Sequence, residues 1–323
     1  GSGEVVASAG MMNPQIRFGE DLMSRVSYLL MKPDGREEMT QVVRAAVNQL
    51  ITETVAAVDS DASHVLELSI AGNPIMHHLF LGLSPVELGT APFALVTDAA
   101  IGQDAASLGL RTNPGAQVYV LPCIAGHVGA DAAAMVLAEA PQTQAGVALV
   151  VDVGTNAEIV LSNNGKLLAC SSPTGPAFEG AQISCGQRAA PGAIERVRID
   201  AETFEPKFKV IGSDLWSDEP GFEAVVAKIG VSGICGSGII EVIAEMYLAG
   251  VVDEDGVIDG SLAERSPRVI PDDRTFSYQL WHGERAIVIS QNDVRQVQLA
   301  KAALYAGIKL LLSREGIETV DQV

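Results

Sequence analysis

Residues 146–172 read GVALVVDVGTNAEIVLSNNGKLLACSS, and this pattern predicts three consecutive strands joined by two tight turns. The run Val147–Val151 is continuously aliphatic, which is typical of a strand buried on both faces. Asn163, Asn164 and Gly165 tolerate the positive φ angles of tight hairpins, so the second turn is predicted there. The chain is therefore expected to be built around a hairpin sheet.

The first turn carries specific chemistry. Asp152 ends the first strand, and a carboxylate at that position suits Mg²⁺, which prefers oxygen ligands and keeps several waters. Gly154 lets the backbone approach a phosphate, and the N–H groups of Gly154, Thr155 and Asn156 are candidate donors to its oxygens. The turn is not a Walker loop, because it lacks Gly-Lys-Ser/Thr and leads into a strand. On these residues alone an ordinary acidic hairpin is the simpler interpretation, and the surrounding sequence favours the phosphate site.

Composition restricts the class of protein. The 323 residues are 48% hydrophobic and carry a formal net charge of −19, which argues against nucleic-acid and anionic-membrane binding. No apolar run reaches the ~18 residues of a membrane span and no signal peptide is recognisable, so a cytoplasmic protein is expected. The four cysteines form no C-x-x-C pair, so we expect reduced thiols and no zinc or iron–sulfur site built from this chain.

The remaining pattern predicts alternating helices and strands, with an irregular insertion over 253–290. Helices are expected over 18–30, 37–58, 130–140, 239–248 and 293–313, and strands over 4–9, 65–70, 118–121, 197–199 and 207–211. His77 and His78 are adjacent on a helix and make a poor joint metal site, so one is expected to be packed and the other exposed.

Further candidate residues lie in loops. Asn73 follows a predicted strand, at the end where ligands collect in α/β sheets. Gly175 belongs to a Gly-, Pro- and Ala-rich stretch that indicates a backbone wall around a ligand, with a surface loop as the alternative. Residues 233–238 form a glycine turn feeding a helix, where Ser237 is placed to cap the helix or touch a phosphate or ribose. Glu241 is placed to accept from ribose hydroxyls.

Several stretches taken together resemble one family. They are NPQIRFGEDLMSR (13–25), AGNPIMHHLFLG (71–82), LPCIAGHVGAD (121–131), DVGTNAEIVL (152–161), TGPAFEGAQISCGQRAAPGAIE (174–195), GICGSGIIEVIAE (233–245) and NDVRQVQLAKAALYAGI (292–308). The chain resembles, over nearly its whole length, the ATP-dependent reductive activators of corrinoid proteins, the RACo group. The strand–Asp-x-Gly-Thr–strand hairpin is similar to the phosphate hairpins of the acetate and sugar kinase, Hsc70 and actin (ASKHA) superfamily.

The resemblance implies an α/β, two-lobed ASKHA fold with RNase H-like mixed sheets flanked by helices. It implies a first lobe over 1–145 and a second lobe over 146–323. The activity implied is ATP hydrolysis with Mg²⁺ that drives reduction of a Co(II) corrinoid protein to Co(I) by a homodimeric enzyme. Asp152, Gly154, Thr155 and Asn156 would form a phosphate hairpin, with Asp152 as the catalytic and metal residue. Gly236, Ser237 and Gly238 would lie near the nucleotide.

By the family pattern, an N-terminal domain with a 2Fe–2S cluster, a first phosphate hairpin and a glycine-rich adenosine loop are expected outside this sequence. A small-molecule kinase of the same fold and a non-catalytic corrinoid-protein docking module are the alternative functions. Stimulation of ATP hydrolysis by the corrinoid protein separates the activator from both.

Overall fold

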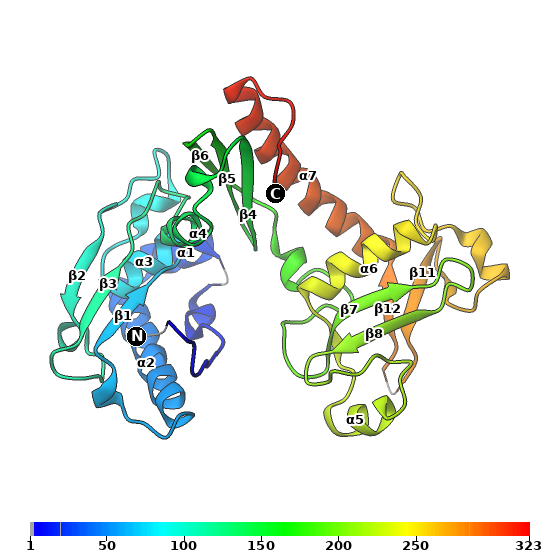
Figure 1. Cartoon of the computed structure of the whole chain (residues 1–323), viewed down its shortest axis with the longest axis horizontal. Helices are drawn as coiled ribbons and strands as arrows, with labels where there is room; N and C mark the ends of the chain where they lie inside the picture. Colours follow the sequence, from blue (N-terminus) through cyan, green and yellow to red (C-terminus); the bar gives the residue numbers. More distant parts are fainter. Residues whose placement is uncertain (1–2, 20, 284) are drawn as a thin grey trace. The chain divides into compact units, whose positions relative to one another are not determined.

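The computed structural model describes residues 3–19, 21–283 and 285–323. The chain divides into two compact units, each described by itself below. The first unit comprises Gly1–Asp152, Glu158–Ser171 and Arg314–Val323, and the second comprises Val153–Ala157 and Ser172–Ser313. Figure 1 shows their helices and strands, with labels where there is room. Among the described residues, no helix has the length and apolar content needed to cross a membrane.

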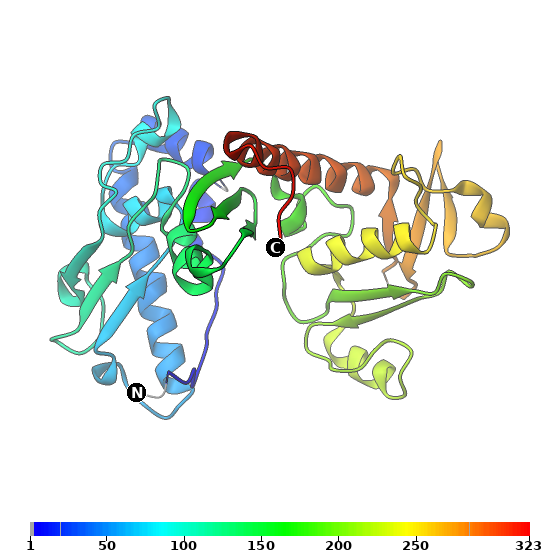
Figure 2. The same ribbon diagram turned by 45° about the horizontal axis from the view of Figure 1, so that its top comes forward.

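One sheet of the first unit has the strand order β1-β3-β2. Strand β1 (Glu67–Ile70) runs parallel to β3 (Gln117–Val120), and β2 (Ile101–Asp104) pairs antiparallel with β3. Val118 and Val120 of β3 are buried, and Val43 and Val47 of helix α2 (Gly35–Ala56) pack against the same core. The apolar face of this long helix therefore covers the sheet (Figure 2).

Helices α1 (Leu22–Met31) and α3 (Pro74–Leu81) complete this part of the unit. Asp21 and Ser24 form a reciprocal capping box that fixes the start of α1. Val26, Met39, Ile75 and Leu79 pack in a second small core. The predicted helices therefore form, whereas the strand expected over 4–9 is wrong, because these residues have no regular structure.

The histidine pair on α3 differs from the prediction that one side chain is exposed. His77 is 2% exposed and His78 is 0% exposed. His78 Nε2 accepts from the N–H of Val96 at 3.0 Å, which puts its proton on Nδ1, 2.9 Å from the Pro74 oxygen. Burial lowers the pKa of both rings, so the pair is a neutral part of the core.

The second sheet associated with the first unit has the order β4-β5-β6 and confirms the three strands predicted from residues 146–172. Its strands are β4 (Val147–Val153), β5 (Ala157–Asn163) and β6 (Lys166–Ser172), and helix α4 (Ala130–Glu139) precedes them. Asn164 and Gly165 have φ angles of 48° and 90°, as the predicted hairpin turn requires. Strand β5 is the central strand of this sheet, and most of its residues are buried.

The second unit contains two further three-stranded sheets. One has the order β8-β7-β9, with β7 (Ala193–Ile199), β8 (Pro206–Val210) and β9 (Gly233–Ile234). The other is an antiparallel meander of β10 (Val269–Asp272), β11 (Thr275–Trp281) and β12 (Ile287–Ser290). This meander corrects the expectation of an irregular insertion over 253–290.

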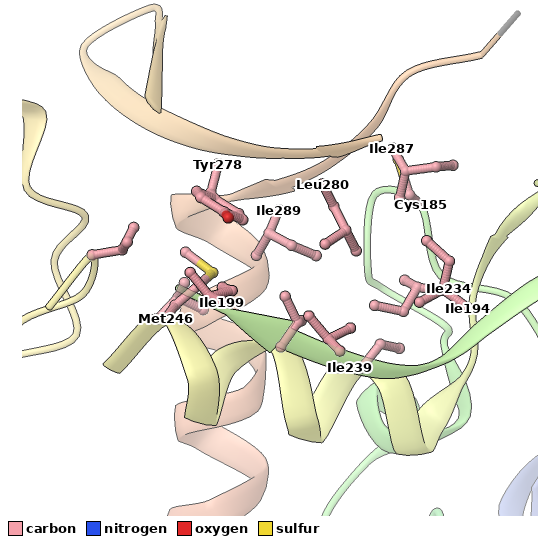
Figure 3. Packing of buried hydrophobic residues seen from close by; sticks show 14 of the residues in the cluster. Cys185, Ile194, Ile199, Ile234, Ile239, Met246, Tyr278, Leu280, Ile287 and Ile289 are labelled. Atoms are coloured by element: carbon pink, nitrogen blue, oxygen red, sulfur yellow. The ribbon is translucent and has the colours of Figure 1, made fainter. Parts of the chain in front are cut away.

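Helices α5 (Phe222–Ile229), α6 (Gly236–Leu248) and α7 (Gln291–Glu315) follow or separate these strands. Figure 3 shows Ile239 and Met246 of α6 in one cluster with Ile194 of β7, Tyr278 of β11 and Ile289 of β12. This core therefore joins both sheets of the second unit through α6. Seven short 3₁₀ helices complete the described structure: η1 (Pro14–Phe18), η2 (Ala62–His64), η3 (Val86–Gly89), η4 (Ala105–Leu108), η5 (Pro141–Thr143), η6 (Pro176–Glu179) and η7 (Gly260–Glu264).

Candidate functional site

The turn between β4 and β5 is braced by the segment that follows β6. Within the turn, the N–H of Gly154 donates to the Asn156 oxygen at 3.2 Å. The Thr174 hydroxyl donates to the Gly154 oxygen at 2.6 Å, and the N–H of Gly175 donates to the Thr155 oxygen at 2.9 Å. Gly175 therefore lies directly against the predicted phosphate turn. Thr174 is a brace that the sequence pattern did not single out.

A carboxylate already contacts one of the predicted phosphate donors. The N–H of Thr155 donates to Oε1 of Glu179 at 3.0 Å, and a Cβ on Gly154 would lie 3.6 Å from the same oxygen. This geometry shows that the Thr155 N–H can reach an anionic oxygen supplied from outside the turn. A phosphate oxygen bound at this N–H has to replace the Glu179 carboxylate.

Three carboxylates of the first unit, which we call the acidic cluster, interact electrostatically: Asp131 in α4, Asp152 at the end of β4 and Glu158 in β5. Glu158 is 7% exposed, and burial, followed by the charge of Asp131, raises its pKa to about 7. Burial also raises the pKa of Asp131, and the charge of Asp152 adds to that effect. The Ser171 hydroxyl donates to Glu158 at 3.1 Å. Two of the three carboxyl groups are therefore placed where ionisation is costly.

The acidic cluster has an excess of negative charge. In the described part of the chain no lysine or arginine forms an ion pair with its members, and no group of three or more His, Cys, Asp or Glu side chains is arranged to hold a metal. Mg²⁺ is commonly held by one or two carboxylates, waters and substrate phosphate, and does not need a full protein cage. The exposed Asp152 carboxylate, with two more acids nearby, fits a cation bound in that way.

Asn73 lies beside the start of α4. Its side-chain oxygen accepts from the N–H of Met76 at 3.0 Å and caps α3. The N–H of Ala130 donates to the Gly72 oxygen at 3.0 Å, and a Cβ on Gly129 would lie 2.8 Å from the Asn73 Cα atom. The structure therefore brings the Asn73 loop next to the segment that carries Asp131, and it assigns the Asn73 side chain a capping contact.

The second unit has a cavity of about 370 Å³ at the start of α6. Glu179, Arg188, Gly236 and Ser237 line it together with Phe178, Ala189 and Cys235. A Cβ on Gly236 would lie 2.0 Å from the Phe178 oxygen, so only glycine fits there. The cavity contains the positive end of a 13-residue helix and the Arg188 guanidinium, which suit an anionic ligand, together with one carboxylate, that of Glu179. Arg188 was missed from the sequence because its partners come from distant segments.

Two predicted nucleotide residues have structural contacts inside the second unit. A Cβ on Gly238 would lie 2.4 Å from the Ile194 oxygen, so this glycine allows α6 to pack closely on β7. Glu241 accepts from the N–H of Val197 at 2.7 Å and also pairs with the guanidinium of Arg198. Both of its carboxylate oxygens therefore have protein donors at the edge of β7.

Known proteins match the chain over both of its parts. The model of the C-terminal domain of RACo, the ASKHA domain, matches residues 146–323, and the model of the RACo middle region matches residues 1–143. The corrinoid activation enzyme RamQ of Eubacterium limosum is 33% identical over 99% of this chain and 52% of its own length. The [Co(II) methylated amine-specific corrinoid protein] reductase of Methanosarcina barkeri is 29% identical over 85% of this chain and 51% of its own length.

A solved structure, a reductive activator for corrinoid,iron-sulfur protein, matches with a TM-score of 0.82 and 31% identity over 98% of this chain and 49% of that chain. The chain thus spans about half the length of the relatives it matches. The match confirms the predicted α/β ASKHA fold. With family models covering both of its parts, the chain belongs to the RACo family and carries the middle region and the C-terminal ASKHA domain of that family.

Proposed function

We propose that this chain is the ATP-binding part of a reductive activator that drives reduction of a Co(II) corrinoid protein to Co(I). The observation that carries the proposal is the contact between the Thr155 N–H and the Glu179 carboxylate, in the turn that follows the last two residues of β4, Asp152 and Val153. In this contact the Thr155 N–H donates to an anionic oxygen. Thr155 comes two residues after the end of β4 at Val153, and three residues after the candidate metal ligand Asp152. The relatives' names supply the reaction class.

Each part of the site has a proposed role. Asp152 would hold Mg²⁺ with its carboxylate, and the bound metal would supply positive charge against the nucleotide phosphates. Thr155 donates its N–H to a phosphate oxygen after Glu179 has moved, while Thr174 and Gly175 keep the turn in shape. Asn156, at the end of the turn, is proposed as a further donor to phosphate. Asn73 is proposed to offer its side-chain amide N–H groups to the ligand, because its side-chain oxygen caps α3.

The cavity at the start of α6 is proposed to hold another part of the nucleotide. Gly236 and Ser237 present the helix N-terminus, and Arg188 adds a positive charge. Gly238 and Glu241 are proposed to support this site indirectly, because their contacts hold α6 against β7.

Reduction of the corrinoid protein is proposed to need the complete protein. Electrons come from the 2Fe–2S domain that the family pattern places outside this sequence. ATP binding shifts the protein toward a conformation that recognises the corrinoid protein, and hydrolysis resets it. The complete protein is proposed to work as a homodimer in the cytoplasm.

The proposal is tested by titrating the full-length protein with Mg·ATP in a calorimeter. Asp152→Asn is expected to weaken binding at least tenfold, because the amide lacks the charge that holds the metal. Asp214→Asn removes an exposed acid elsewhere in the chain and serves as the matched control, with affinity expected to stay at the wild-type value. Equal affinity for the wild type and Asp152→Asn, with circular dichroism unchanged, would remove Asp152 from the site.

A further inference from the structure

The first unit contains a cavity of about 580 Å³ that the proposed function does not use. It lies between helix α2 and the segment formed by η4 and the residues after it, and we call it the arginine groove. Its polar lining residues include Gln41, Arg44, Asn48, Gln49, Ser107 and Arg111. Its volume falls in the range of cavities that hold metabolites.

The charge of the groove is opposite to that of the protein. The chain has 40 Asp and Glu against 21 Lys and Arg, yet the described residues that line the groove include two arginines and neither Asp nor Glu. On α2, Glu37 and Glu53 flank the lining residues without being among them, and they accept from the side-chain amides of Gln41 and Gln49 at 3.1 and 2.8 Å. Attraction of an anion is therefore local to this cavity.

One face of α2 forms a wall of the groove. Gln41, Arg44, Asn48 and Thr52 recur at helical spacing, so they line the same side of the helix, whereas Val43 and Val47 pack on the core. The Cα atoms of Gln41 and Thr52 are eleven helical steps apart, which is about 16 Å at 1.5 Å per residue. The groove is thus long enough for an extended organic ligand.

Asn48 fixes the two walls to each other. Its Nδ2 donates to the Gly109 oxygen at 2.9 Å, and its Oδ1 accepts from the N–H of Arg111 at 2.6 Å. The backbone that carries Arg111 is therefore tied to α2 without using the Arg111 side chain. A cavity held in this way is formed before a ligand arrives, which reduces the entropy lost on binding.

Arg44 is held at one end and is otherwise not neutralised. Its Nε donates to the Phe80 oxygen near the C-terminus of α3 at 2.8 Å, and burial lowers the pKa of its guanidinium with no carboxylate opposing that effect. Neither Arg44 nor Arg111 forms an ion pair in the described part of the chain. Since a guanidinium has five N–H donors and stays protonated, Arg44 retains donors at both Nη atoms for a ligand oxyanion.

We propose that the arginine groove binds an elongated small organic anion that carries phosphate or carboxylate groups. Arg44 and Arg111 pair with its oxyanion groups, while Ser107 and the side-chain amides of Gln41 and Gln49 bind its polar body. This site is separate from the residues assigned to ATP, so the inference does not rest on the proposed function.

The test is calorimetry of the full-length protein at low ionic strength with EDTA, using pyrophosphate and citrate as probes. At least one probe is expected to bind, and Arg111→Ala is expected to weaken that binding tenfold or more, since charge-assisted hydrogen bonds are lost. The matched control is Arg36→Ala, which removes an exposed arginine of α2 that does not line the groove. This variant should bind the probes as the wild type does. The tighter probe distinguishes a phosphate ligand from a carboxylate ligand.

Pyrophosphate could also bind at the proposed nucleotide site, and the Asp152→Asn variant distinguishes the two sites. The part of the binding heat that is lost in Arg111→Ala should be unchanged in Asp152→Asn. Arg44→Gln tests whether Arg44 only caps α3. A lower melting temperature with unchanged probe affinity in Arg44→Gln would contradict the role of Arg44. The proposal is overturned if neither probe binds, if Arg111→Ala binds as tightly as the wild type, or if a polyglutamate peptide binds while both small anions do not.

Discussion

The acidic cluster and the arginine groove lie in the same unit and concentrate charges of opposite sign. The cluster holds Asp131, Asp152 and Glu158, and the groove holds Arg44 and Arg111. In the described residues, neither set has an ion-pair partner of the opposite sign. The two regions respond differently to this excess. Carboxyl groups can bind protons, as the raised pKa of Glu158 indicates, whereas guanidinium groups stay charged and depend on hydrogen bonds or a ligand.

Because only one of the two charges changes with protonation, the two regions should respond to different solution conditions. The acidic cluster is sensitive to pH and to cations, because its charge changes with protonation. The arginine groove is sensitive to anions and salt, because its charge is constant and partly exposed. The variants below test whether this distinction holds.

The largest expected effect is on the pH dependence of stability in Glu158→Gln. The folded pKa of about 7 lies above the usual value of 4.5, so the stabilisation by the protonated form is fully present below pH 4.5 and is lost as the pH rises through 7. The loss amounts to about 3 kcal/mol. Glu158→Gln should therefore gain about that much over the wild type at pH 8 and little at pH 4.5.

Native-state hydrogen exchange of β5, corrected for the intrinsic effect of pH, measures this difference locally. Glu223→Gln, an exposed glutamate of α5, controls for the removal of one negative charge. Parallel stability curves for the wild type and Glu158→Gln would show that Glu158 ionises normally in the folded protein.

A smaller effect is expected when the anchored arginine is shortened. Arg44→Gln loses the hydrogen bond from Nε to the Phe80 oxygen, which should lower the stability of the first unit by about 1–2 kcal/mol. Added citrate or pyrophosphate should raise the melting temperature of the wild type more than that of the variant. An equal rise in melting temperature for the wild type and Arg44→Gln would mean that the anions do not bind through Arg44.

Removal of one neighbouring charge should shift the protonation of Glu158 without unfolding the sheet. Asp131→Asn is expected to lower the pKa of Glu158 below its value of about 7, because the Asp131 charge is the second cause of the elevation after burial. The pH midpoint of β5 exchange is the measurement, and Glu87→Gln, exposed in the same unit, is the control. An unchanged midpoint would exclude the Asp131 charge and leave burial and the charge of Asp152 as the causes of the raised pKa.

The smallest effect is expected for stability in Arg111→Ala. The side chain is exposed, and the contact to Asn48 uses only the Arg111 backbone, so the unfolding free energy should change by less than about 0.5 kcal/mol. Thermal unfolding at low salt without anions checks this. A large loss would show that Arg111 supports the fold, in contrast to the ligand role inferred for it.

Local sequence pattern predicted the elements that depend on local chemistry. The hairpin turn at Asn164 and Gly165, the long helix α2 and the glycine turn before α6 are present as expected. The meander over β10–β12 was missed, because its strands are stabilised by a core shared with α6 that no local pattern reveals. Both buried histidines also depend on distant partners, as the bond from Val96 to His78 shows.

For the candidate site, residue types are informative only about local positions. Residue types placed Asp152, Thr155 and Gly236 at turns, and the structure finds Gly236 at a cavity where a side chain does not fit. The roles of Thr174 and Glu179 as partners of the turn depend on contacts about 20 residues away along the chain, and sequence spacing does not encode them. Glu241 shows the limit of residue type as a signal. It is an acidic residue close to the glycine turn, as a ribose ligand would be, yet its carboxylate accepts from the Val197 N–H of β7.

The most direct test of the central claim is the rate of ATP hydrolysis by the full-length protein with and without its candidate corrinoid protein in the Co(II) state. We predict that the corrinoid protein raises the rate and that Asp152→Asn abolishes the rise, while Asp214→Asn keeps it. A flat rate accompanied by phosphoryl transfer to a small molecule would contradict the activator and identify a kinase. No hydrolysis under either condition would contradict it in favour of a docking module.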